Sequence, residues 1–221
     1  MKKFVLAFLS IVVCLGAVAQ NYDKMEKEAV KKIHAKPEKL ARKQAKKDAK
    51  AGWQIAPGQM PIEKQYDTYY KMLYMEDNNG LPYYITGEAM SVGGGYDAAL
   101  MTATTLAKSD LAGKIQTEIA GLIEVSLSNE QISPDDAVSL SRVVSESKNL
   151  IAARLTNVRQ PIIIYRRTSE NAVEVRTVVV YSHDEAKTAA KAAIKRGLEE
   201  SGKELRTELD KLLGFDKDDK E

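Results

Sequence analysis

The stretch YYITGEAMSVGGGY, residues 83–96, decides the fold of this chain. From Tyr83 to Val92 the side chains alternate with the period of a β-strand. The glycines at 93 to 95 then allow the backbone angles of a tight turn, after which a helix begins. Such a turn can also present amides to a phosphate, but no lysine followed by serine or threonine comes next, as a nucleotide-binding motif requires. We therefore interpret these glycines as a strand-to-helix turn.

Two helices are predicted after this turn. The first carries an apolar face formed by Tyr96, Leu100, Ala103, Ala107, Leu111, Ile115, Ile119 and Leu122. The second begins with Ser133 as its cap and Pro134 at its first position, followed by two aspartates that suit the helix dipole. Its apolar stripe predicts an end near Leu155.

A hairpin and a last helix complete the predicted core. The runs 159–167 and 172–181 are rich in Ile, Val and Tyr and are joined by a polar turn, so they predict two antiparallel strands, with Pro161 at a strand start or sheet edge. Ser182 and Glu185 form a capping pair that opens a helix reaching Leu212. At about 1.5 Å per residue this helix would be roughly 45 Å long, so its far end is expected to pack on another helix or another chain.

The fold class is therefore α+β: a small three-stranded antiparallel sheet packed on long helices, in the order β-α-α-β-β-α. This core is expected over residues 83–213, followed by a charged tail at 214–221. A linker and an amphipathic helix occupy 52–82, where Pro61 opens the helix and Asp77-Asn78-Asn79-Gly80 follows it as a turn. Residues 20–51 form a basic helical extension whose apolar stripe is thin.

The first 19 residues have the three parts of a secretory signal peptide. Lys2 and Lys3 precede a short apolar run, and Ala17-Val18-Ala19 is a cleavage site. The run is shorter than the about 20 residues of a membrane span. We therefore expect an exported protein, in the periplasm or associated with the outer membrane. A lipid anchor at Cys14 is the less favoured alternative, because Val13 occupies the place where such sites carry a small residue.

The basic extension suggests partners. Residues 23–50 contain eleven Lys or Arg against five Asp or Glu. This charge favours an anionic membrane surface, a polyanionic glycan or an acidic partner protein, while export argues against nucleic acid. A solvated helix is the alternative interpretation. The candidate contact residues are Lys39, Arg42, Lys43, Lys46 and Lys47.

Tyrosines are concentrated between Tyr66 and Tyr84. Some of them must pack the amphipathic helix against the first strand, and those on the other side of that helix can bind a partner or stack on sugar rings. The candidates for this role are Tyr66, Tyr69, Tyr70 and Tyr74.

Motifs that would support catalysis or metal binding are weak. Ser182-His183-Asp184 contains the residue types of a hydrolase triad, but adjacent residues point in different directions, and capping explains Ser182. Asp135 and Asp136 are explained as first-turn helix charges. His34 is interpreted as solvated. We expect no catalytic residue, no metal and no cofactor.

The sequence resembles the LPP-twenty lipoprotein family over about residues 83 to 200. The resemblance is carried by the run Gly87-Glu-Ala-Met-Ser-Val-Gly-Gly-Gly95, then Ala98, Ala99, Ala103, Ala107, Asp110-Leu111-Ala112 and Ile115. Ala107-Lys108 stands where the family has alanine and arginine, and Cys14 lacks the family's lipidation context. The resemblance implies a dodecin-like fold and a cell-envelope protein without an established reaction.

These observations predict an exported, non-enzymatic envelope protein. It would act through self-assembly or through contacts with other envelope proteins. The alternative is a ligand- or glycan-binding module that uses the tyrosines from Tyr66 to Tyr84.

Overall fold

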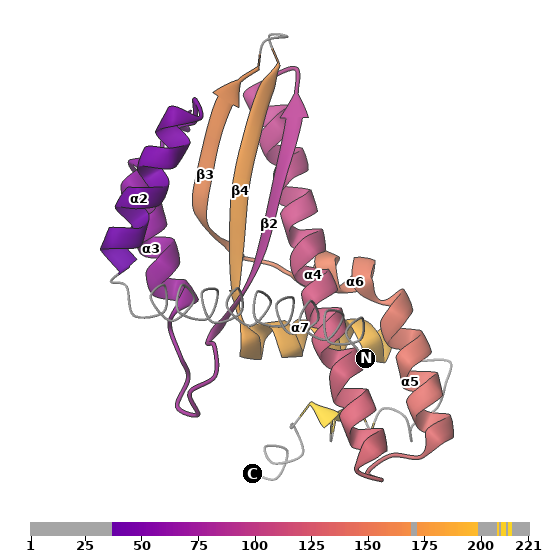
Figure 1. Cartoon of the computed structure of the whole chain (residues 1–221). Helices are drawn as coiled ribbons and strands as arrows, with labels where there is room; N and C mark the ends of the chain where they lie inside the picture. Colours follow the sequence, from indigo (N-terminus) through magenta and orange to yellow (C-terminus); the bar gives the residue numbers. More distant parts are fainter. Residues whose placement is uncertain (1–36, 169–171, 199–206, 208, 211, 214–221) are drawn as a thin grey trace, which may run out of the picture.

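The computed structural model describes residues 37–168, 172–198, 207, 209–210 and 212–213. Within them a four-stranded antiparallel sheet lies between helices on both faces, and one long helix extends beyond the sheet into a helical bundle (Figure 1). The predicted α+β class is confirmed. The predicted signal peptide, Cys14, His34 and the tail at 214–221 lie outside the described residues.

The sheet has the strand order β1-β3-β4-β2. The predicted strands are confirmed as β2 (Tyr84–Gly93), β3 (Arg159–Arg167) and β4 (Val173–Ser182). The sequence predicts Pro161 at a strand start or a sheet edge; it lies near the start of β3, at the register shift between Arg159 and Ile162, where a residue that cannot donate to the ladder is tolerated.

The prediction of three strands is wrong, because β1 (Gln54–Ile55) pairs with Tyr165 and Ile164 of β3. These two residues lie in the segment predicted as a linker. A strand of two residues is too short to show any alternation in sequence, and it forms only because the edge of β3 offers it hydrogen bonds.

One face of the sheet is covered by α4 (Tyr96–Ser128). Its buried residues over the sheet are small, as at Ala99, Ala103 and Ala107, so helix and strand approach closely. Gly87 of β2 permits this approach: a Cβ atom there would lie 2.1 Å from the carbonyl oxygen of Ala107. The predicted apolar face is confirmed except at its end, where Ile123 is buried and Leu122 is exposed.

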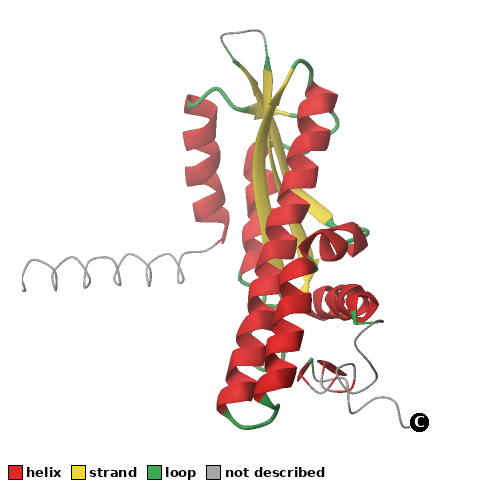
Figure 2. Cartoon of the chain, turned by 90° about the vertical axis from the view of Figure 1, so that its right-hand side faces the viewer, coloured by secondary structure: helices red, strands yellow, loops and turns green. Residues whose placement is uncertain are grey.

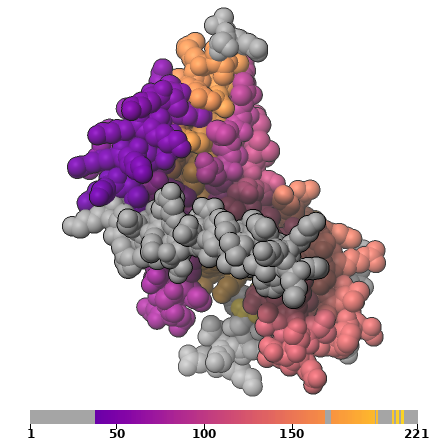
Figure 3. Space-filling model, in the orientation of Figure 1, coloured from indigo at the N-terminus to yellow at the C-terminus, as the bar shows by residue number. Residues whose placement is uncertain are grey.

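The other face is covered by α2 (Pro37–Lys50) and α3 (Ile62–Leu73). The interpretation of the basic segment as an extension is wrong for residues 37–50, because α2 buries Ala41 and Asp48 and packs beside α3. A thin stripe of small residues is sufficient here because Trp53, Ile62 and the sheet supply the apolar bulk. Figure 3 shows α2, in indigo, as an outer layer of the molecule. The turn predicted at 77–80 is confirmed, with Asp77 accepting hydrogen bonds from the amides of Asn79 and Leu81.

The helix predicted from Ser133 to Leu155 is two helices, α5 (Pro134–Glu146) and α6 (Lys148–Arg154). The predicted cap is confirmed, since the Ser133 hydroxyl accepts a hydrogen bond from the Asp136 amide at 3.1 Å. The break lies at Ser147. Near it the Gln116 side chain of α4 donates to the carbonyls of Val144 and Ser145, at 2.6 and 2.8 Å, and the Val144 carbonyl also accepts from the Ser147 amide at 3.1 Å.

The last helix, α7, spans His183–Gly197 and is shorter than predicted. Its cap is confirmed, because the Ser182 hydroxyl accepts a hydrogen bond from the Glu185 amide. A straight helix of 45 Å is contradicted by Asp210, whose carboxylate oxygens lie 3.0 Å from Lys191 Nζ and 2.8 Å from Lys195 Nζ. Asp210 therefore lies back against α7, whereas a continuous helix would place it about 22 Å beyond Lys195. The expectation that the far end of this segment packs on another helix or another chain is met within the chain, because Leu209 and Leu213 are buried in one core cluster with residues of α4, α5, α6 and α7.

The lower half of α4 forms a helical bundle with α5, α6 and α7 (Figure 2). Its core joins residues from all four helices, including Ile119, Leu140, Ile151 and Ile194. Among the described residues, no helix combines the length and the apolar character that a membrane crossing requires.

Candidate functional site

A buried polar cluster fixes α2 on α3 and the sheet. The Tyr66 hydroxyl of α3 donates a hydrogen bond to Asp48 of α2 at 2.6 Å. Arg176 of β4 places Nη2 2.7 Å from the same Asp48 oxygen and 2.9 Å from the Tyr66 hydroxyl. Burial, and then the hydrogen bond to Asp48, raise the pKa of Tyr66 well above its usual range. Tyr66 is therefore a neutral donor.

Trp53 secures the end of α2. The guanidinium carbons of Arg166 and Arg176 both lie 4.7 Å from the centroid of its ring, a distance typical of cation–π contacts. Arg166 also donates to the Ala51 carbonyl at 3.1 Å and pairs with Glu174 at 2.5 Å. These contacts hold the last turn of α2, and with it the lysines of that turn, in a defined place.

Beside this cluster lies a groove of about 700 Å³ between α2 and the end of α3. We call it the lysine–tyrosine groove. It is lined by Leu40, Lys43, Gln44, Lys46, Lys47, Lys50, Tyr70 and Tyr74.

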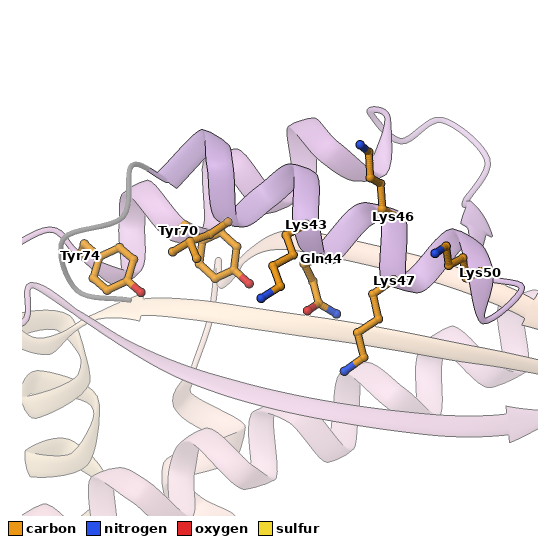
Figure 4. A pocket seen from close by; sticks show the side chains of 8 residues that line it. Lys43, Gln44, Lys46, Lys47, Lys50, Tyr70 and Tyr74 are labelled. Atoms are coloured by element: carbon orange, nitrogen blue, oxygen red, sulfur yellow. The ribbon is translucent and has the colours of Figure 1, made fainter. Parts of the chain in front are cut away.

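Most side chains of the groove come from one flank of each helix, and Lys46 is the exception. Figure 4 shows Lys43 and Lys47 extending to the same side of α2 as the hydroxyls of Tyr70 and Tyr74, whereas Lys46 extends to the opposite side. Lys43 and Lys47 are four residues apart, and Lys50 is three residues further, so these three lie on one helix flank.

The groove lysines make no ion pair within the part of the chain that the structure describes. The acidic residues of α2 do not compensate them, because Asp48 is paired with Arg176, and Glu38 lies at the other end of the helix. The charges of Lys43, Lys47 and Lys50 therefore make the groove electropositive and attractive to anions.

Tyr70 and Tyr74 supply the aromatic part of the groove. Their rings stack with centroids 6.4 Å apart and an angle of 24° between the planes, which four-residue spacing on a helix allows. Tyr70 is half-buried, and burial raises the pKa of its phenol. Tyr74 is 40% exposed, so a ligand can reach its ring.

The structure brings together five of the nine candidate residues: Lys43, Lys46, Lys47, Tyr70 and Tyr74. The other four lie elsewhere. Tyr66 is buried, and Tyr69 is half-buried against the sheet with its hydroxyl beside Thr86. Arg42 pairs with Glu63 at 3.0 Å, and Lys39 is exposed outside the groove.

The sequence analysis missed Leu40, Gln44 and Lys50. A helical projection of residues 40–50 could have found them, because they fall on the same flank as Lys43 and Lys47. That projection does not reveal the tyrosines opposite, which the packing of α2 on α3 decides.

The other motifs have structural roles. Ser182 caps α7, and its hydroxyl also donates to the Glu185 carboxylate at 2.7 Å, while His183 Nδ1 lies 3.5 Å from Glu118. No nucleophile, base and orienting acid are aligned there. Asp136 accepts a hydrogen bond from Ser133. In the described ranges no group of three or more His, Cys, Asp or Glu residues is placed to hold a metal ion.

Comparison with models of protein families, with curated proteins and with solved structures finds no match. The geometry of the lysine–tyrosine groove is therefore the basis for a functional proposal.

Proposed function

We propose that the chain is an exported, non-enzymatic protein of the cell envelope whose lysine–tyrosine groove binds an anionic glycan. One observation carries this proposal. Three lysines on one flank of α2, without a described ion-pair partner, lie beside two stacked tyrosine rings in a hollow between two helices.

Each part of the groove matches a part of such a ligand. A carboxylate or phosphate on a sugar accepts hydrogen bonds from the lysine ammonium groups. The apolar face of a sugar ring packs on an exposed tyrosine ring, and sugar hydroxyls meet the phenol hydroxyls. A flat anionic membrane surface would use the lysines but would leave the half-buried Tyr70 unused.

Isothermal titration calorimetry with a linear uronic acid oligomer, such as hexagalacturonate, tests the proposal. The neutral oligomer chitohexaose serves as the comparison ligand. We expect hexagalacturonate to bind and its affinity to fall as salt rises, because screening weakens ion pairs at a solvent-exposed site. Equal affinity for both oligomers, or binding of neither, would overturn the proposal.

Substitutions locate the binding. Lys43→Gln and Lys47→Gln should each weaken binding of hexagalacturonate about threefold, the scale of an exposed ion pair. Tyr74→Ala should weaken it by a similar factor without changing its salt dependence. Lys39→Gln removes the same charge from α2 outside the groove and should change affinity little. If Lys39→Gln had the same effect as Lys47→Gln, the groove would not be the site.

Export, in the periplasm or at the outer membrane, is supported by the sequence of residues 1–19. Mass spectrometry of the protein produced in a bacterial host should find a mature chain that begins at Gln20. A diacylated Cys14 would instead favour the anchored alternative.

Membership of the LPP-twenty family with a dodecin-like fold is part of the same proposal. It is supported by the run Gly87–Gly95 and by the alanines that follow on α4. Gly87 and Gly93 lie against Ala107 and Ala99, so the small residues of the run serve helix–strand contact. A solved structure of a family member with the same contacts would support it, and one with a different strand order would contradict it.

A further inference from the structure

β2 is an edge strand, because it lies last in the strand order and pairs only with β4. On the side of β2 that faces away from β4, the backbone N–H and C=O groups form no hydrogen bonds with a described strand. The amide of Glu88 and the carbonyl of Thr86 both bond to side chains of α4, which shows that even-numbered residues of β2 direct their backbone groups outward.

The first half of this edge is closed by α4. Asp110 accepts a hydrogen bond from the Glu88 amide at 3.1 Å, and Lys114 donates to the Thr86 carbonyl at 2.8 Å. The two side chains are themselves 3.0 Å apart as an ion pair. Charged side chains placed on an edge in this way protect it against pairing with another chain.

The second half of the edge is open. No described residue bonds to the outward backbone groups of Met90 or Val92. Both side chains are exposed, at 53% and 57%, on the sheet face that α2 and α3 leave uncovered beside β2. Figure 1 shows β2 at the margin of the sheet, with α4 running beside it.

Near Met90, α4 carries an apolar residue in place of the charged one that it carries near Glu88. Leu106 lies one turn before Asp110, and a turn of 5.4 Å corresponds to about one and a half residues of a strand. This places Leu106 near Met90, with 47% of its surface exposed. Free backbone groups between exposed apolar side chains are the features of a site for strand addition.

We propose that the open half of β2 pairs with the same segment of a second copy of this chain, antiparallel and about a twofold axis at Ser91. Met90 of each copy then lies opposite Val92 of the other as a hydrogen-bonded pair. Each such pair exchanges two hydrogen bonds, so the two pairs satisfy all four outward groups of Met90 and Val92 on each copy. The bonds of Asp110 and Lys114 stay intact.

The segment is its own best partner. Residues 89–93 carry no charge, and Met90 against Val92 is an apolar cross-strand pair that the twofold axis repeats. Glu88 lies beyond the paired residues, with its amide still bound by Asp110, so no like charges meet. α2 and α3 lie toward the β3 side of the sheet, and the pairing leaves the lysine–tyrosine groove open.

Disulfide cross-linking tests this geometry in the full chain carrying Cys14→Ser, which otherwise has no cysteine. In the proposed register the two Ser91 residues form a non-hydrogen-bonded pair with Cα atoms about 4.5 Å apart, within the range of a disulfide. Ser91→Cys should therefore give a covalent dimer on mild oxidation. Ser145→Cys, an exposed serine on α5, should not.

Sedimentation velocity on the uncross-linked protein completes the test. The chain should dimerise, and Val92→Lys should raise the dimer dissociation constant at least tenfold, because it sets a charge against Met90 of the partner. Val138→Lys, on the exposed side of α5, should leave it unchanged. A monomer at all concentrations up to about 1 mM, a dimer insensitive to Val92→Lys, or capture of Ser91→Cys by a different protein would each overturn the proposal.

Discussion

The Tyr66 hydroxyl lies 2.6 Å from Oδ2 of Asp48 and joins α3 to α2 beneath the lysine–tyrosine groove. Both residues are buried, and Arg176 contacts both of them. The three side chains therefore act as one polar cluster that sets the distance between the lysines and the tyrosines.

Breaking the charge pair of this cluster should cost more stability than removing one hydrogen bond. Asp48→Asn leaves the largely buried Arg176 without a counter-charge and should lower the free energy of unfolding by about 3 kcal/mol. Tyr66→Phe removes a hydroxyl and should lower it by about 1 kcal/mol. Urea denaturation of the three proteins gives both values. Equal losses would mean that Asp48 contributes only as an acceptor.

Stability should also fall at alkaline pH through Tyr66. Its folded-state pKa is raised by burial, so its contribution is complete below the unfolded-state value of about 10 and is lost as pH rises above that value. Urea denaturation between pH 8 and 11 should show a shallower decline for Tyr66→Phe than for the unmodified protein. Tyr74→Phe, whose ring is 40% exposed, is the control and should keep the original decline.

Gly87 should not tolerate a side chain. In Gly87→Ala the added Cβ would lie 2.1 Å from the Ala107 carbonyl oxygen and 2.8 Å from the Leu111 amide nitrogen, so α4 would have to move away from β2. We expect a loss of about 3 kcal/mol, at the upper end for overpacking. Gly94→Ala has no atom within 4 Å of its new Cβ and should leave the melting temperature nearly unchanged. A similar fall for both variants would contradict the close approach.

Asp210 should make stability sensitive to acid. Burial alone would raise the pKa of its carboxyl, but the hydrogen bonds from Lys195 and Lys191 outweigh burial and hold the pKa below its usual value. The contribution is therefore present above the unfolded-state value of about 3.9 and is lost as pH falls below it. Asp210→Asn should flatten the stability profile in that acidic range. An unchanged profile would show that the chain does not return to α7 in solution.

The elements that the sequence predicted correctly depend on neighbours along the chain. The alternation in β2, β3 and β4, and the caps at Ser133 and Ser182, are contained in short windows of residues. The apolar face predicted for α4 differs from the observed face only at its end, where Ile123 is buried in place of Leu122. Local periodicity and capping are sufficient for such elements because their energetic causes are local.

The candidate site was predictable in composition but not in arrangement. The excess of Lys and Arg, and the run of tyrosines, indicated which residue types could bind an anionic or ring-shaped ligand. Which lysines face which tyrosines depends on how α2 docks on α3, and the Asp48–Tyr66 contact that docks them joins residues 18 positions apart.

The sequence by itself determined the α+β class, three strands and the positions of the turns, because these follow from local patterns of apolar residues, glycines and caps. Tertiary structure alone decided the pairing of β1 with β3, the docking of α2, the break at Ser147 and the contact of Asp210 with α7. Each of these four features depends on a contact between residues distant in the chain, such as Gln116 with Val144 and Lys195 with Asp210. Such contacts form only when the packed core has brought the partners together, so no local window of sequence contains them.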